Sequence, residues 1–267
     1  MSTTKERIEE IRSNGYQLDF GTVFEHAFEN YRKIALYAGS MLLVFSVLIG
    51  IVVIGIAFSV ATAIFNVDVD SITKMLQPEN LQPENFSVNF LLIYFTIIVL
   101  ITCLISPFQA GFLKMADCGE KGEEFHVATI FEYYKAPYFK EIIVSTFLIT
   151  LMSAGLSMAI EFSGIKIIGT IISMTISFLT FLTIPLIVFG KLDATEAIKS
   201  SVVIIAKQPF LLLALLIVAG IASIVGFIGC CIGVFFTIPF VYSMYYVIYS
   251  EIIGVDSESE MEEIIES

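Results

Sequence analysis

The chain has 267 residues, of which 57% are hydrophobic, and its formal net charge is −12. Soluble domains are normally about 45–50% apolar, and nucleic-acid-binding domains carry a basic face, so this composition argues against both classes. The apolar residues lie in long blocks without charge, which is the pattern of an all-α, polytopic membrane helix bundle.

Residues 1–33 are expected to form charged and amphipathic helices on the cytoplasmic side. A short charged helix is predicted over Thr4–Arg12, ended by Asn14 and Gly15. The segment after it presents one apolar face, which is typical of a helix that lies at the membrane interface or covers the mouth of the bundle. The residues on this face are Val23, Phe24, Ala27, Phe28 and Tyr31. The apolar block that follows is too long for the core of a cleavable signal peptide.

Six spans are predicted from the distances between charged residues. About 20 helical residues cross the hydrocarbon core, and four blocks without Asp, Glu, Lys, Arg or His each fit one crossing. A fifth block, 208–250, is long enough for two crossings, with a reversal near Gly226, Gly229 and Gly233. The predicted spans are about 34–64, 86–113, 142–160, 167–190, 208–228 and 231–250.

The distribution of Lys and Arg predicts that both termini are cytoplasmic. Twelve of the 14 lie in the N-terminal segment and in the segments after the second and fourth spans, which share one side of the membrane. Cytoplasmic loops carry such an excess of positive charge, and six crossings return the C-terminus to the side of the N-terminus. Residues 251–267, which are rich in acids, are expected to be a solvated cytoplasmic tail. The alternative is a regulatory or partner-binding tail.

Equal spacings predict a threefold internal repeat within residues 34–250 and the segment before them. Amphipathic helices over about 127–140 and 193–206 precede the third and fifth spans, as the N-terminal helix precedes the first. The three segments can be aligned on the lysine that ends each. The repeated unit would be an amphipathic helix followed by a helical hairpin, arranged about an axis along the membrane normal. Chance alignment of short apolar segments is the alternative.

A proline in each even-numbered span supports the repeat. Pro107, Pro185 and Pro239 are each predicted to kink a helix, because proline removes one backbone hydrogen bond. In a membrane the freed carbonyl needs another donor. The hydroxyl groups that could supply one belong to Ser106, Thr183 and Thr237.

Hydroxyl side chains are the main polar feature of the third and fourth spans. Such side chains commonly bond to their own helix or to a neighbouring one, which is a structural role. The alternative is a polar path for a solute between these two spans. The residues of this path would be Thr150, Ser153, Ser173, Thr175, Ser177 and Thr180.

The sequence predicts no catalytic, cofactor-binding or metal-binding residues. The central parts of the spans carry no charged residue, which argues against a proton relay or a charged substrate at the midplane. The two histidines, His26 and His126, fall on cytoplasmic segments and are too few for a metal site. The four cysteines lack CxxC spacing, and no nucleotide-binding glycine loop is present.

Three short motifs resemble a known group of proteins. The motifs are LDFG at 18–21, EAIKSS at 196–201 and GVFFTIP at 233–239. Together they resemble uncharacterised bacterial six-span membrane proteins, akin to the membrane domain attached to some glycerophosphodiester phosphodiesterases. The resemblance covers most of the chain and implies the bacterial inner (plasma) membrane. It brings no catalytic residue with it, because these 267 residues contain no phosphodiesterase domain.

The expected function is a non-enzymatic one, with a structural, lipid-organising or accessory role in the membrane. This hypothesis follows from spans without charge and from three predicted interfacial helices. A carrier or pore for a neutral or lipid-like solute is the alternative, and an enzyme acting at the interface is a third hypothesis. The expected partner is the lipid bilayer, without nucleic acid and without cofactor. No pattern predicts a protein partner or an oligomeric state.

Overall fold

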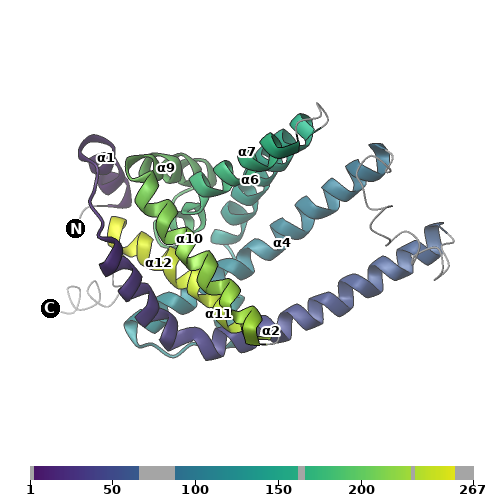
Figure 1. Ribbon diagram of the computed structural model, residues 1–267, viewed down its shortest axis with the longest axis horizontal. Helices are drawn as coiled ribbons and strands as arrows, with labels where there is room; N and C mark the ends of the chain where they lie inside the picture. The colour runs from purple at the N-terminus through teal and green to yellow at the C-terminus, as the bar shows by residue number, and fades with distance from the viewer. Residues whose placement is uncertain (1–2, 66–87, 162–165, 230–231, 256–267) are drawn as a thin grey trace.

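The computed structural model describes residues 3–65, 88–161, 166–229 and 232–255, and every regular element among them is helical (Figure 1). The predicted all-α class is therefore confirmed. Most of the predicted acidic tail, 256–267, lies outside the described residues.

A reciprocal cap starts helix α1 (Thr4–Asn14). The Glu6 N–H donates to Thr3 Oγ1 at 3.3 Å, and the Thr3 N–H donates to Glu6 Oε2 at 2.9 Å. These bonds satisfy two amides that have no partner within the helix. Gly15 ends the helix with a φ of 74°, which residues with a Cβ rarely adopt. Because Ile11 is fully buried, α1 packs on the rest of the chain.

The first amphipathic segment and the first predicted span form one continuous helix, α2 (Phe20–Phe65), of 46 residues. Asp19 precedes α2 and accepts a hydrogen bond from the Thr22 N–H at 2.8 Å. This bond lowers the pKa of Asp19. At about 1.5 Å per residue α2 is about 70 Å long, roughly twice the thickness of a bilayer core. The sequence of α2 contains no proline, so nothing separates the interfacial part from the span.

Pro107 lies inside α4 (Val88–Lys121), which continues through it as a single helix. The proline cannot donate to the carbonyl of Cys103, and Ser106 Oγ donates to that carbonyl instead, at 2.8 Å. The predicted compensation by a hydroxyl group is therefore confirmed at this proline.

The amphipathic segment predicted over 127–140 is not one helix. The structure divides it into α5 (Val127–Ile130), the 3-10 helix η2 (Glu132–Tyr134) and the start of α6 (Tyr138–Glu161). Pro137 explains the break between η2 and α6, because proline lacks an N–H and disfavours helical geometry in the residue before it.

Pro185 lies near the start of a short helix, just after a break in the fourth predicted span. α7 (Lys166–Thr180) ends before it, and α8 (Thr183–Val188) contains it. Thr183 Oγ1 is buried without a hydrogen-bond partner, so this hydroxyl does not compensate for the proline as predicted.

The predicted segment over 193–206 is a helix, α9 (Ala194–Lys207), and α10 (Pro209–Val225) follows it at an angle of 101°. Asp193 caps α9 by accepting hydrogen bonds from the N–H groups of Glu196 at 2.9 Å and Thr195 at 3.0 Å, and the bond from Glu196 is the largest of several contacts that lower the pKa of Asp193. Pro209 lies at the first position of α10 and separates the two helices.

A glycine contact closes the last hairpin, where a reversal was predicted. α10 leads through the 3-10 helix η3 (Gly226–Gly229) towards α11 (Gly233–Thr237). A Cβ at Gly226 would overlap the backbone of Gly233, so the two backbones approach too closely for any larger residue.

Pro239 is the first residue of α12 (Pro239–Ile253), a position where the missing N–H removes no helical bond. Thr237 Oγ1 donates across the hairpin to the carbonyl of Ser223 at 2.6 Å. The predicted role of Thr237 therefore changes: its hydroxyl joins two helices, because Pro239 at the start of α12 frees no helical carbonyl.

Within the described residues, five stretches are long and apolar enough to cross a membrane: parts of α2, α4 and α6, the pair α7–α8, and the pair α11–α12. The bent pair α9–α10 adds a sixth if α10 is a crossing. The start of α1 and the end of α12 lie at the same end of the molecule, as an even number of crossings requires (Figure 1).

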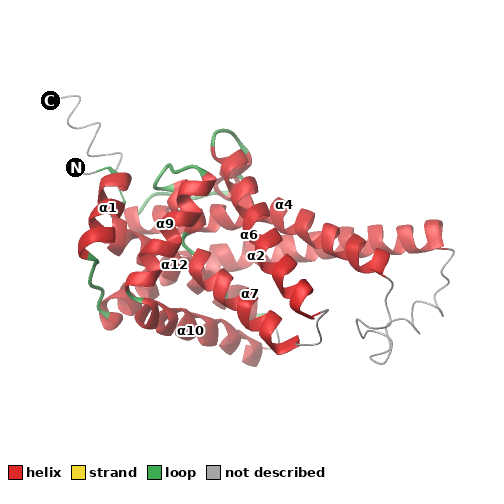
Figure 2. Cartoon of the chain, turned by 90° about the horizontal axis from the view of Figure 1, so that it is seen from above, coloured by secondary structure: helices red, strands yellow, loops and turns green. Residues whose placement is uncertain are grey.

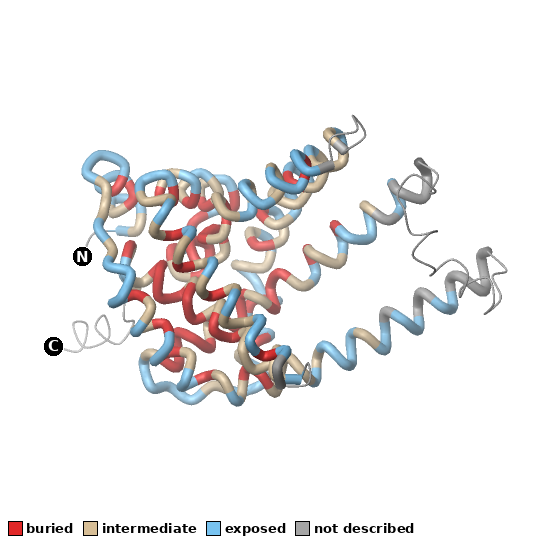
Figure 3. Tube along the Cα trace, in the orientation of Figure 1, coloured by how far each residue is buried: buried red, intermediate tan, exposed pale blue. Residues whose placement is uncertain are grey.

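The helices converge at the end of the molecule where α1, α9 and α12 lie, and their outer parts diverge from it (Figures 1 and 2). Buried residues concentrate in this region, whereas the outer parts of α2, α4 and α7 are largely exposed (Figure 3). We call this region the base. Its packed core includes Ala27, Leu113, Ile204, Val247 and Tyr249.

The three units of the predicted repeat adopt different geometries. The segment before the span is continuous with it in α2, divided before α6, and sharply bent between α9 and α10. The threefold repeat therefore stays a prediction.

Candidate functional site at the base

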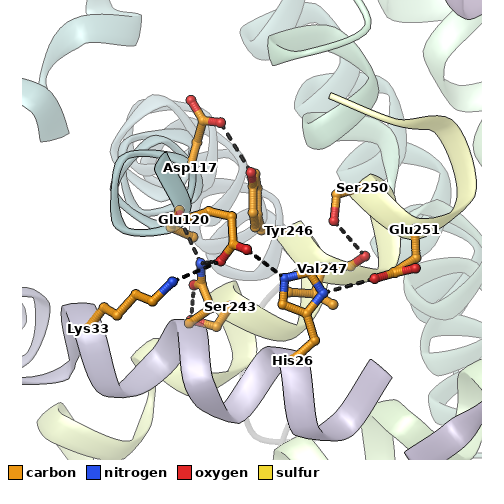
Figure 4. Close-up of polar contacts among 11 residues, drawn as sticks. His26, Lys33, Asp117, Glu120, Ser243, Tyr246, Val247, Ser250 and Glu251 are labelled. Carbon is orange, nitrogen blue, oxygen red and sulfur yellow. Dashed lines mark hydrogen bonds and ion pairs between the residues drawn. The ribbon is translucent and has the colours of Figure 1, made fainter. Parts of the chain in front are cut away.

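Polar side chains from three helices meet inside the base (Figure 4). His26, Asn30 and Lys33 share one face of α2, because residues three and four apart are neighbours on a helix. They face polar residues of the two helices packed against α2. These residues are Asp117 and Glu120 of α4, and Ser243, Tyr246 and Glu251 of α12.

Asn30 lies at the centre of this cluster and is fully buried. Its Nδ2 donates to the carbonyl of Ala116 at 2.8 Å and to Glu120 Oε2 at 3.1 Å, and its Oδ1 accepts from Ser243 Oγ at 2.9 Å. An asparagine amide has two donors and one acceptor oxygen, and all three are engaged here. This one side chain therefore ties α2, α4 and α12 together.

Asp117 is a buried carboxylate, with its side chain only 1% exposed. Lys114 Nζ lies 2.9 Å from Oδ2 and Lys121 Nζ lies 3.2 Å from Oδ1, while the Tyr246 hydroxyl donates to Oδ1 at 3.2 Å. A charge removed from water must be paired and hydrogen-bonded, and this carboxylate meets both conditions.

His26 bridges two carboxylates from different helices. Its Nε2 lies 2.9 Å from Glu120 Oε1 on α4, and its Nδ1 lies 2.9 Å from Glu251 Oε1 on α12. Because each ring nitrogen has its own carboxylate partner, the three side chains do not point at a common centre. Among the residues the structure describes, no group of His, Cys, Asp and Glu could hold a metal ion.

One pair of residues from the predicted polar path joins α6 to α7. Ser153 of α6 and Ser173 of α7 share a hydrogen bond of 2.7 Å between their hydroxyl groups. Thr175 and Thr180 instead donate to carbonyls of their own helix, at 2.8 and 2.7 Å. The remaining members, Thr150 and Ser177, lie on α6 and α7 as half-buried and exposed residues.

A surface cavity of about 270 Å³ lies between α1 and α9. Most of its charged residues pair with one another: Lys5 Nζ lies 2.7 Å from Glu196 Oε2, and Arg12 Nη1 lies 2.9 Å from Glu9 Oε1. Exposed pairs of this kind contribute little, about 0–1 kcal/mol. The buried cluster in the base is therefore the stronger candidate site.

No protein-family model, curated protein or solved structure matches the chain. The contacts of the base are therefore the basis for its role, and the resemblance to the bacterial six-span proteins stays a prediction.

Sequence reasoning missed most of this site. It placed Asn30, Asp117 and Glu120 in cytoplasmic segments because they lie outside the charge-free blocks, although their helices continue past those blocks. One local signal was available, the spacing of His26, Asn30 and Lys33 along one helical face.

Proposed function

We propose that this chain is a non-enzymatic protein of the bacterial inner membrane, with both termini cytoplasmic and a structural, lipid-organising role. The base would hold the helices at fixed positions, and their apolar outer parts would act on the surrounding lipid. The observation that carries this proposal is the exposure of α2 beyond the base.

Over one full turn, the outer part of α2 is exposed on every side among the residues the structure describes. Ser46, Val47, Leu48 and Ile49 are consecutive exposed residues. Successive residues of an α-helix are about 100° apart, so four of them point around the whole circumference. A helix with apolar residues on every side is solvated by lipid when it spans a membrane.

The hydroxyl groups on the outer helices support the same environment. Thr96 and Thr102 of α4 donate to carbonyls four residues earlier, both at 2.8 Å, and Ser40 of α2 donates to the carbonyl of Leu36 at 2.7 Å. A hydroxyl satisfied within its own helix needs neither water nor a neighbouring helix. These helices can therefore stand in hydrocarbon without a partner.

The polar residues of the base support a holding role. Asn30, Asp117 and Ser243 are buried, and their hydrogen bonds go to other side chains or backbone atoms of the base. Groups engaged in this way fix helix positions, whereas a catalytic site needs groups that a substrate can reach.

The proposal is tested by reconstituting the purified chain in phospholipid vesicles and measuring two quantities. Deuterium NMR order parameters of labelled acyl chains are expected to change relative to protein-free vesicles, because splayed helices disturb lipid packing. Mass spectrometry of the lipids after incubation is expected to find no new product. Time-dependent conversion of any lipid would overturn the non-enzymatic role, and unchanged order parameters would overturn the lipid-organising one.

The carrier hypothesis makes a different prediction for the hydroxyl groups of α7. We expect the double substitution Thr175→Val and Ser177→Val to leave glycerol flux through proteoliposomes and thermal unfolding unchanged, because Thr175 serves its own helix and both side chains are exposed. As a matched comparison, Ser153→Ala removes a bond between helices and should cost about 0.6 kcal/mol of stability. A flux present in the wild type and abolished by the double substitution would favour the carrier.

A further inference from the structure

The bridge formed by His26 is partly exposed, whereas Asn30, Asp117 and Ser243 of the base are buried. The ring nitrogens face one carboxylate on α4 and another on α12, each at 2.9 Å. The side chains of His26, Glu120 and Glu251 are 27%, 32% and 35% exposed. Water can therefore reach the bridge and exchange a proton with it.

The number of hydrogen bonds in this bridge depends on one proton. An imidazolium ring donates from both nitrogens, so it can serve Glu120 and Glu251 at once. A neutral ring has one N–H and one lone pair, so it can donate to only one ionised carboxylate, and its lone pair repels the other.

The surroundings decide which of the two contacts is lost. Glu120 keeps two further partners, Asn30 Nδ2 at 3.1 Å and Lys33 Nζ at 3.4 Å. For Glu251, His26 is the one side-chain partner among the described residues. Glu120 is therefore held in place beside the ring, whereas Glu251 can turn away from the lone pair, so the neutral ring would stay with Glu120 and release Glu251.

Charged groups from four helices surround the bridge. Of the side-chain types present there, histidine is the one with an ordinary pKa between about pH 5 and 8. On α1, Arg7 Nε donates to the carbonyl of Ile252 at 3.1 Å, and its Nη1 pairs with Glu10. The charged or titratable groups facing the bridge are Lys33 of α2, Asp117, Glu120 and Lys121 of α4, Tyr246 and Glu251 of α12, and Arg7 and Glu10 of α1.

We propose that His26 is a proton-dependent latch for the end of α12. The protonated ring holds the last turn of α12 against α2 and α4. Loss of the proton frees Glu251, and this turn then keeps the bond from Arg7 and the packing of Ile252 and Ile253. The latch is closed at lower pH and opens as the pH rises through the titration of His26. It goes beyond the proposed function, because it regulates the base whatever the outer helices do in the lipid.

Hydrogen exchange of the full chain in detergent micelles tests the latch. The amides of residues 250–253 are compared at pH 6 and pH 9, with exchange times scaled for the intrinsic pH dependence of amide exchange. In the wild type we expect protection to fall at pH 9 by about tenfold or more, the scale of one lost hydrogen bond to a charged group. Equal protection at the two pH values would overturn the proposal.

Variants at the two histidines sharpen this test, because the chain contains only two. His26→Gln should exchange at pH 6 as fast as the wild type does at pH 9, and His26→Arg, which keeps its charge, should stay protected at both. The matched control is His126→Gln, which should respond to pH as the wild type does. If His26→Gln fails to fold, Glu251→Gln gives a second measurement, and its pH response should be lost. A wild-type pH response in Glu251→Gln or in His26→Gln would refute the latch.

Discussion

Replacing Gly111 by alanine is expected to destabilise the base by about 3 kcal/mol or more. A Cβ at this position in α4 would overlap the backbone of Ile130 in α5. Neither side can move cheaply, because Ile130 is fully buried and the clashing atoms belong to its backbone. Thermal unfolding in detergent micelles, followed by far-UV circular dichroism, would report the loss as a large fall in Tm.

The chain provides a matched control for this substitution. Gly155 also lies within a helix, α6, but a Cβ added there would meet no atom within 4 Å. Gly155→Ala should therefore be neutral or stabilising by up to about 1 kcal/mol, because alanine is the better helix former. If Gly111→Ala melted at the wild-type temperature, the close contact between α4 and α5 would be wrong.

The membrane-spanning helices could be predicted from the sequence because their signal is local. A helix in hydrocarbon must exclude charge over about 20 consecutive residues, and that pattern can be read directly from the chain. The joints between helices are harder to predict from the sequence. A segment shows the same apolar periodicity whether its helix continues into the span, as in α2, or meets the span at an angle of 101°, as between α9 and α10. Pro209 and Pro137 mark two of these joints, yet Pro107 interrupts nothing.

The polar cluster of the base could not be predicted in the same way, because its contacts join distant parts of the chain. Asn30 and Ser243 are 213 positions apart, and Asp117 and Tyr246 are 129 apart. Local spacing shows that His26, Asn30 and Lys33 share a face, but it does not say which helix packs against that face. Nothing local in the sequence shows that the carboxylate of Asp117 is buried.

Replacing Asp117 by leucine is expected to cost about 3 kcal/mol of stability. The substitution leaves two lysine ammonium groups without their counter-charge and removes the acceptor of the Tyr246 hydroxyl. Breaking a buried ion pair by removing one partner costs about 3–5 kcal/mol. The lower value applies here because the side chains of Lys114 and Lys121 are 23% and 26% exposed and can reach water. Thermal unfolding in micelles measures the effect, with Glu29→Gln as the control for an exposed acid on α2.

A triple substitution separates lost charge pairing from lost shape at this site. Combining Lys114→Met and Lys121→Met with Asp117→Leu removes the unpaired charges along with the carboxylate. Because a buried ionic group replaced as a whole by apolar residues is often neutral in stability, the triple variant should recover most of the loss in Tm seen for Asp117→Leu alone. If instead it melted as low as the single variant, the charges would not be what Asp117 is needed for, and the loss would belong to the hydroxyl of Tyr246, the acceptor of which is absent in both variants.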